Sequence, residues 1–300
     1  MNVKLLSISK LVIISVFTAT ALMVGCNGDN ANVEDQIEDS VNTNNPDEFN
    51  KAKQVIYGIP SPIETAMLMK RAGAKYNQDY LNPITNLGNY TSTKSMALNL
   101  GVYGTDLSFA SMFDQSQTSI KYLSATKKLA DDLGILNAID KSIITRMETN
   151  INNRDSLMQI ISETFMNSNS FLKENDRAEI AAIILAGGWL EGLYAGCQVA
   201  KNTASNKELI ERIADQRLSL NTLISLMSEY KDDPNIQAVM PDMERLKTVF
   251  DKIQTSSSKM EVTEKDGKSI ISSKSEVKVS TEVFNEICKT SAEIRANIIK

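Results

Sequence analysis

The pattern of apolar and polar residues along most of this chain is typical of amphipathic helices. No proline occurs between Pro83 and Pro234, and leucine, isoleucine, alanine and methionine, which favour helices, are abundant there. This pattern predicts a succession of helices that pack their apolar faces together. We expect helices over residues 62–74, 93–113, 115–133, 137–151, 154–175, 177–201, 206–231, 235–254 and 281–299.

Short motifs mark where several of these helices begin and end. Ser61-Pro62-Ile63-Glu64 combines a capping box with proline at the first helical position. Asp176-Arg177-Ala178-Glu179 and Ser205-Asn206-Lys207-Glu208 follow the same logic at two later helices. Gly134 is placed to end the third helix, and Pro241 is expected to bend the eighth.

Residues 255–280 depart from the helical pattern. Apolar and polar residues alternate toward Asp266-Gly267, and two isoleucines follow. This arrangement fits a small β-hairpin near residues 259–273, and a flexible insert of serine and lysine is the competing interpretation. The sequence therefore predicts an all-α protein, a multi-helix bundle of about nine helices, in a single domain over residues 51–300.

The N-terminus has the features of an export signal. Two lysines precede an uncharged apolar run over residues 11–24, which is shorter than the about 20 apolar residues that cross a hydrocarbon core. The run ends in Met23-Val24-Gly25-Cys26, which resembles the lipobox of bacterial lipoproteins. That resemblance implies removal of residues 1–25 and lipidation of Cys26. A retained membrane helix and a secretory signal with an incidental cysteine are the alternatives.

Residues 26–50 are predicted to be a disordered tether. They contain seven acidic residues, seven asparagines and no lysine or arginine, so they cannot bury enough apolar surface to offset the entropy of ordering. A chain of this length holds the body roughly 25 to 30 Å from the lipid. Because Asn27 follows the cysteine instead of the aspartate that retains lipoproteins at the inner membrane, the resemblance implies the outer membrane of a Gram-negative bacterium.

Charge and histidine content narrow the chemistry of the body. The chain has 32 basic and 37 acidic residues; the signal holds two of the basic ones and the tether seven of the acidic ones, which leaves 30 of each. A neutral body has no net field that attracts nucleic acid. The chain contains no histidine, which excludes Ser-His-Asp and Cys-His catalysis and nearly every zinc site. We predict no cofactor and no bound metal.

One predicted helix is almost free of charge. Residues 180–200 contain a single charged side chain, Glu191. Three glycines spaced four residues apart lie on one stripe of this helix: Gly188, Gly192 and Gly196. Such a stripe lets a neighbouring backbone approach closely, with Glu191 paired to a lysine or arginine. Alternatively, the missing side chains leave room for a ligand walled by Trp189 and Tyr194.

A second candidate lies in the helix over residues 93–113. Tyr103 and Asp106 are one turn apart and share a helix face, although Asp106 would merely cap a helix if Gly104 breaks the chain. If the two glycine-rich helices pack together, Asp106 and Glu191 converge into a carboxylate pair for a cation or a hydroxylated ligand. The candidate pocket comprises Tyr103, Asp106, Trp189, Glu191 and Tyr194.

Two cysteines, Cys197 and Cys288, remain after Cys26 is lipidated. In an oxidising compartment they form one disulfide if their Cα atoms come within about 7 Å. The alternative is a pair of buried free thiols that behave as small apolar residues.

Three segments of the body resemble a group of uncharacterised helical envelope lipoproteins: residues 57–62 (YGIPSP), 100–106 (LGVYGTD) and 185–192 (LAGGWLEG). This resemblance implies the envelope address and brings no activity. We therefore expect a membrane-anchored envelope lipoprotein whose helical body binds a protein partner or a small ligand without catalysis. The alternative is a histidine-independent glycan hydrolase with Asp106 and Glu191 as its carboxylates, roughly 5 to 10 Å apart in an open cleft.

Overall fold

The structure is a computed structural model that describes residues 69–71, 73–135, 141–157, 159–161, 163–164, 177–202, 207–257, 261–265, 268–272 and 275–300. All of these residues belong to the unit Asn45–Lys300. The export signal, Cys26, the tether and the capping motif at Ser61 lie outside the described residues, as do the cap residues Asp176 and Ser205.

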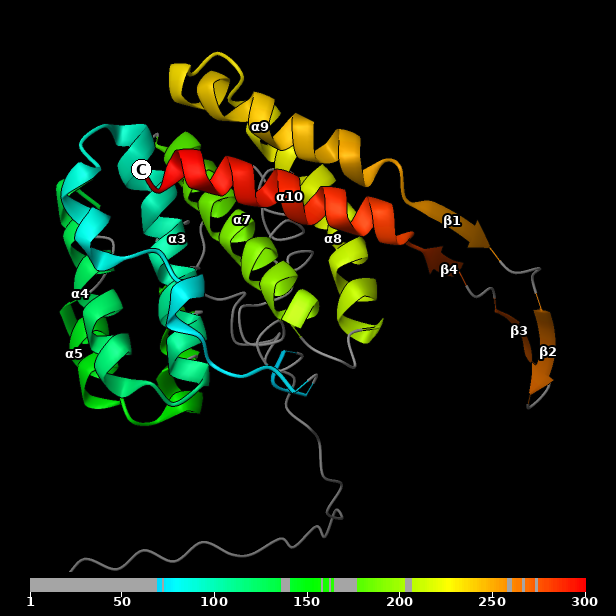
Figure 1. Cartoon of the computed structure of the whole chain (residues 1–300), viewed down its shortest axis with the longest axis horizontal. Coiled ribbons are helices and arrows are strands. Elements are labelled where there is room, and N and C mark those ends of the chain that lie inside the picture. The colour runs from blue at the N-terminus through cyan, green and yellow to red at the C-terminus, as the bar shows by residue number, and fades with distance from the viewer. Residues whose placement is uncertain are drawn as a thin grey trace, which may run out of the picture. The chain divides into compact units, whose positions relative to one another are not determined.

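Helices make up most of the described residues, which confirms the all-α class (Figure 1). Six long helices in this part of the chain agree with predicted ranges to within a few residues: α3 (Thr93–Met112), α4 (Ser116–Asp132), α7 (Ala178–Asn202), α8 (Lys207–Glu229), α9 (Pro234–Phe250) and α10 (Thr281–Ile298). α5 (Lys141–Thr149) lies within the predicted helix over residues 137–151. Two short 3-10 helices, η3 (Gln78–Tyr80) and η4 (Ile84–Asn89), were not predicted.

Local hydrogen bonds explain several helix boundaries. α3 begins with a capping box, in which Ser95 N–H donates to Ser92 Oγ and Ser92 N–H donates to Ser95 Oγ. Asp233 caps α9 by accepting from two backbone N–H groups, and proline follows at the first helical position. Gly134 ends α4 with φ +69°, a left-handed conformation that favours glycine, as the sequence predicts.

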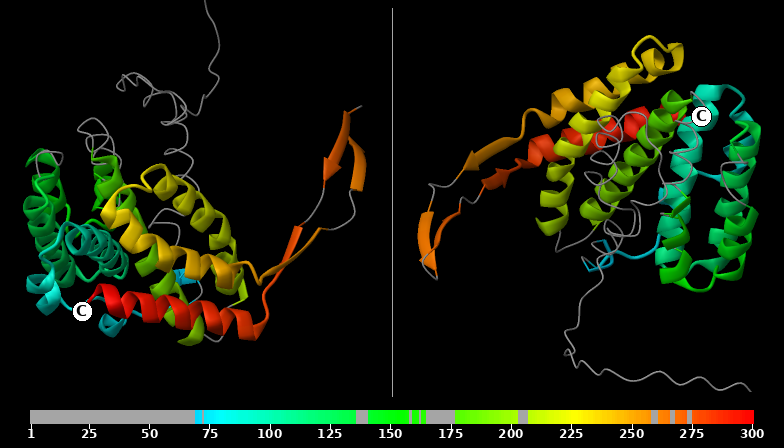
Figure 2. Two further views of the ribbon diagram at one scale, coloured as in Figure 1. Left: turned by 90° about the horizontal axis from the view of Figure 1, so that it is seen from above. Right: turned by 180° about the vertical axis from the view of Figure 1, so that it is seen from behind.

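A narrow antiparallel ribbon joins α9 to α10 and extends away from the helices (Figures 1 and 2). β1 (Gln254–Ser257) pairs with β4 (Ser275–Lys278), and β2 (Glu261–Lys265) pairs with β3 (Lys268–Ser272). Val262 lies opposite Ile271 in this register. The hairpin predicted near residues 259–273 is therefore present, and the pairing of β1 with β4 lengthens it. α9 ends at Phe250, four residues earlier than predicted, and β1 begins at Gln254.

α3 and α7 pack at backbone contact in the middle of the bundle. A Cβ placed on Gly101 of α3 would lie 2.6 Å from the Gly188 nitrogen of α7, and one placed on Gly187 would lie 2.8 Å from the Leu98 carbonyl carbon. Real Cβ atoms essentially never come within 3.0 Å of such atoms. Only glycine therefore fits at Gly101 and Gly187.

The glycine stripe predicted on α7 is thus corrected in position. The tight contact uses Gly187, which is outside the predicted stripe, and a Cβ on Gly188 would come to 3.3 Å from Gly101 O. A Cβ on Gly192 would meet nothing within 4 Å, and one on Gly196 would make an ordinary 3.6 Å contact with a methionine side chain. The closest contact on α7 is therefore at Gly187, one residue before the predicted stripe begins. α3 crosses α7 at this end of the stripe and does not run along its whole length.

α7 is the core helix of the described residues. Its length and composition would suffice to cross a membrane, yet 83 % of its most apolar window is buried inside the bundle. α3, α8 and α10 pack around it. Its one central charged side chain, Glu191, is consequently enclosed by protein. A carboxylate in such a place needs polar partners from the neighbouring elements.

Candidate functional site

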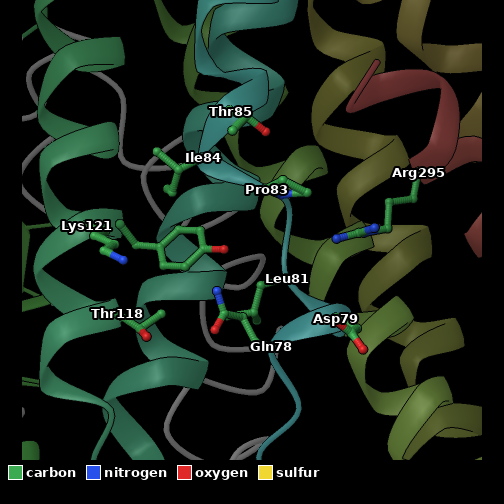
Figure 3. Close-up of a pocket in the computed structure, with 10 residues that line it drawn as sticks. Gln78, Asp79, Leu81, Pro83, Ile84, Thr85, Thr118, Lys121 and Arg295 are labelled. Carbon is green, nitrogen blue, oxygen red and sulfur yellow. The ribbon is translucent and has the colours of Figure 1, made fainter.

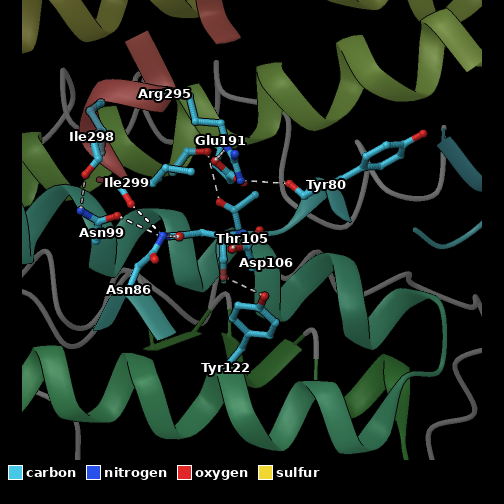
Figure 4. Close-up of polar contacts among 12 residues, drawn as sticks. Tyr80, Asn86, Asn99, Thr105, Asp106, Tyr122, Glu191, Arg295, Ile298 and Ile299 are labelled. Carbon is cyan, nitrogen blue, oxygen red and sulfur yellow. Dashed lines mark hydrogen bonds and ion pairs between the residues drawn. The ribbon is translucent and has the colours of Figure 1, made fainter. Parts of the chain in front are cut away.

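Glu191 of α7 and Arg295 of α10 form a buried ion pair. The Glu191 side chain is 1 % exposed and that of Arg295 is 7 % exposed. Arg295 Nε donates to Glu191 Oε2 and Arg295 Nη2 to Oε1, each at 2.6 Å, so the pair is bidentate. The same Nη2 donates to the Tyr80 carbonyl at 3.0 Å (Figure 4). The guanidinium lies 4.0 Å from the centre of the Tyr194 ring.

Asp106 of α3 joins this pair from the other side. Asp106 is 1 % exposed, and its Oδ2 accepts a hydrogen bond from the Asn82 backbone N–H at 3.0 Å. Burial raises the pKa of Asp106 well above its usual range, and the charge of Glu191 and a hydrogen bond with it act in the same direction. Asn82 N–H and Arg295 oppose the shift. The environment therefore favours a neutral Asp106 beside a charged Glu191–Arg295 pair.

Three tyrosines pack in a row next to Asp106. The ring centres of Tyr103 and Tyr90 are 6.0 Å apart, and those of Tyr103 and Tyr122 are 5.7 Å apart. Tyr103 Oη donates to the Pro83 carbonyl and Tyr122 Oη to the Asn82 carbonyl. Burial raises the pKa of both Tyr103 and Tyr122, so these hydroxyls stay protonated and act as fixed donors.

Asparagine side chains tie the end of α10 to the same cluster. Asn86 Nδ2 donates to the Ile299 carbonyl at 2.8 Å, and Asn99 Nδ2 donates to the Ile298 carbonyl at 3.0 Å (Figure 4). These carbonyls belong to the last turn of a helix, where no intrahelical donor is left. The cluster thus joins α3, α7, α10 and the η3–η4 segment by satisfied hydrogen bonds.

The structure brings together four of the five residues proposed from the sequence. Asp106, Glu191 and Tyr194 surround Arg295, and Tyr103 lies beside Asp106. Trp189 lies on another face of α7, where its Nε1 donates to Ser219 Oγ at 3.0 Å and its ring is 6.3 Å from that of Phe250. Trp189 therefore packs against α8 and α9 and not against the carboxylates.

Sequence reasoning did not find Arg295, which organises the cluster. A signal was present, because Phe284, Cys288, Ser291 and Arg295 follow the spacing of the buried face of α10. An arginine at such a core position indicates a buried ion pair. Asn82, Asn86 and Asn99 carry no comparable signal, since asparagine is mostly exposed in folded proteins and nothing in the sequence marks these three as buried.

A cavity of about 540 Å³ opens beside the cluster (Figure 3). Gln78, Asp79 and Pro83 belong to the η3–η4 side of its lining, Thr118 and Lys121 come from α4, and Arg295 reaches it from α10. Neither Asp106 nor Glu191 lines it. Within the described ranges there is no group of three or more histidine, cysteine, aspartate or glutamate residues that could hold a metal ion.

Cys197 and Cys288 are buried free thiols in the structure. Burial is the largest cause that raises the pKa of the Cys197 thiol.

No protein-family model matches the chain, and comparison with curated proteins and with solved structures gives no match either. The resemblance to helical envelope lipoproteins stays a prediction.

Proposed function

We propose that the chain is a membrane-anchored lipoprotein of the cell envelope, with a helical, non-catalytic body that binds a protein partner or a small ligand. The address rests on the export signal and on Cys26 in its lipobox, and the acidic tether sets the body away from the membrane. The outer membrane of a Gram-negative bacterium is the proposed location.

One observation carries the non-catalytic part of the proposal: the two candidate carboxyl groups lie in a closed and fully paired cluster. Glu191 is held by both ends of a bidentate pair with Arg295, and Asp106 is kept neutral by burial. A hydrolase needs both groups in contact with substrate and water, one as an acid and one as a base or nucleophile. The bidentate pair serves instead to fix α10 on α7.

Two features of the described residues favour binding. The ribbon from β1 to β4 extends away from the helices beyond the contact of β4 with α8, and β2 and β3 each pair on one edge within the described residues, so their other edges are available for a partner strand. The cavity beside Arg295 has the size of a small-molecule site and is lined by both apolar and polar side chains. The ribbon supports the protein partner and the cavity supports the small ligand.

The anchor is tested by fractionating cells of a Gram-negative host that express the full chain or its Cys26→Ser variant. The wild type should sediment with the outer membrane, and the variant should be released into the soluble fraction. Membrane association of the variant would contradict the lipid anchor.

The binding role is tested with a photo-crosslinking residue placed at Ser269 on the ribbon, at Thr118 in the cavity, or at exposed Ser124 on α4 as the matched control. A discrete product at Ser269 and none at Ser124 would support a protein partner. A low-molecular-mass adduct at Thr118 would support a small ligand. Equal, diffuse labelling at all three sites would argue against both.

The alternative, a carboxylate-based glycan hydrolase, requires the cluster to open. Turnover of envelope glycans by the wild type that is lost in both Asp106→Asn and Glu191→Gln would favour it over the binding role. The conservative Asp106→Asn change is informative because it keeps the hydrogen bond from Asn82.

A further inference from the structure

α7 and α10 run in opposite chain directions where they pack, and two pairs of side chains connect them (Figure 1). The first is the Glu191–Arg295 ion pair. The second is Cys197 with Cys288. Cys197 lies six residues after Glu191, and Cys288 lies seven residues before Arg295. At 1.5 Å per residue these steps are about 9 and about 10.5 Å along the two helices, so an antiparallel pair that is in contact at one site stays in register at the other.

The two thiols face each other in a closed space. Cys197 and Cys288 are both 0 % exposed, and the Cys288 thiol contributes to the raised pKa of the Cys197 thiol, so the two side chains lie close together. Ser291 lies beside the pair: its hydroxyl donates to the Cys288 carbonyl at 3.1 Å, and it opposes the rise in the pKa of the Cys197 thiol. Two buried thiols that interact, on helices already held together by a buried ion pair, meet the first requirement for a disulfide, which is that the two cysteines lie side by side.

We propose that Cys197 and Cys288 form a disulfide in the mature protein and join α7 to α10 covalently. This inference rests on the proposed envelope address, because disulfides persist in oxidising compartments. The two thiols lose two protons and two electrons as the Sγ–Sγ bond forms. The acceptor is the disulfide of an envelope thiol oxidoreductase, whose S–S bond breaks and which leaves as a dithiol.

Burial sets when the bond can form. In the folded protein no oxidant reaches either sulfur, and a thiol whose pKa is raised by burial contains little of the reactive thiolate. Exchange with the oxidoreductase therefore takes place while α10 is still folding onto α7. Once formed, the bond closes a loop of roughly 90 residues, which restricts the unfolded chain and stabilises the folded one.

The test uses the full chain purified from the envelope after acid quenching, denatured and treated with a thiol-reactive maleimide before and after reduction. We expect Cys197 and Cys288 to be labelled only after reduction, with the linked peptides detected by mass spectrometry. The melting temperature should fall by on the order of 10 °C with reductant. Cys197→Ala should leave Cys288 labelled without reduction and a melting temperature that reductant does not change.

A second measurement separates this disulfide from the address on which it rests. The Cys26→Ser chain, which keeps only the two body cysteines, is reduced, denatured and refolded in a glutathione redox buffer. A disulfide on refolding, together with free thiols in chain that is recovered from the cytoplasmic fraction of the cells, would refute the address and with it the disulfide in the cell. Free thiols after refolding, while wild-type chain still fractionates with the membrane, would overturn the disulfide alone.

Discussion

Alanine at Gly101 or Gly187 should destabilise the protein, because each glycine lies at the backbone contact between α3 and α7. A Cβ on Gly101 would overlap the Ile184 carbonyl oxygen and lie 2.6 Å from the Gly188 nitrogen, and ordinary contact begins at 3.4 Å, so the helices must separate by more than the about 0.8 Å that the nitrogen alone requires. Overpacking of this kind costs about 1 to 3 kcal/mol, and more when the obstacle is backbone. The better helix propensity of alanine returns about 1 kcal/mol. We expect a net loss of about 2 kcal/mol.

Gly104 and Gly192 provide matched controls on the same two helices. A Cβ at either position would meet nothing within 4 Å, so only the helix propensity changes and alanine should stabilise by about 1 kcal/mol. Gly101→Ala and Gly104→Ala should therefore differ by about 3 kcal/mol in the free energy of unfolding. This difference is about 6 to 12 °C in melting temperature for a domain of this size.

Urea unfolding of the four unlipidated variants, followed by circular dichroism, measures these differences directly. Equal midpoints for Gly101→Ala and Gly104→Ala would refute the inference that α3 and α7 touch at backbone distance. A loss at Gly192→Ala would restore the glycine stripe predicted from the sequence.

Two further predictions concern the buried cluster. Asp106→Asn should raise the melting temperature at neutral and alkaline pH and leave it nearly unchanged near pH 4. The reason is that the pKa of Asp106 is raised in the folded protein, so wild-type stability falls as pH rises from the pKa of Asp106 in the unfolded chain toward its pKa in the folded protein. A wild-type melting temperature that rises over this range through the titration of Asp106 would contradict the neutral carboxyl. Arg295→Met should cost about 3 to 5 kcal/mol in urea unfolding, since Glu191 is left buried without its partner. As a control, Arg245→Met breaks the exposed ion pair with Glu293 and should cost under about 1 kcal/mol. Similar losses for the two arginine variants would contradict the burial of Glu191 in the folded protein.

Most of the helices of this protein could be predicted from local patterns in the sequence. The positions of α3, α4, α7, α8 and α10, the start of α9, the end of α4 at Gly134 and the hairpin between α9 and α10 are local properties, set by residues a few positions apart through periodicity, caps and turn chemistry. The lack of histidine likewise excludes whole classes of catalysis without any knowledge of the fold. The sequence also pointed to Asp106 and Glu191 as the unusual carboxylates.

The role of those carboxylates depends on contacts between distant segments of the chain. Glu191 and Arg295 are 104 residues apart, and whether they meet depends on how α10 crosses α7, which no local pattern encodes. The same holds for the one-residue difference between the predicted glycine stripe and the contact at Gly187, and for Trp189, which lies on a different face of its helix from Glu191. Helical period fixes which residues share a face, whereas side-chain packing between distant segments fixes what that face touches.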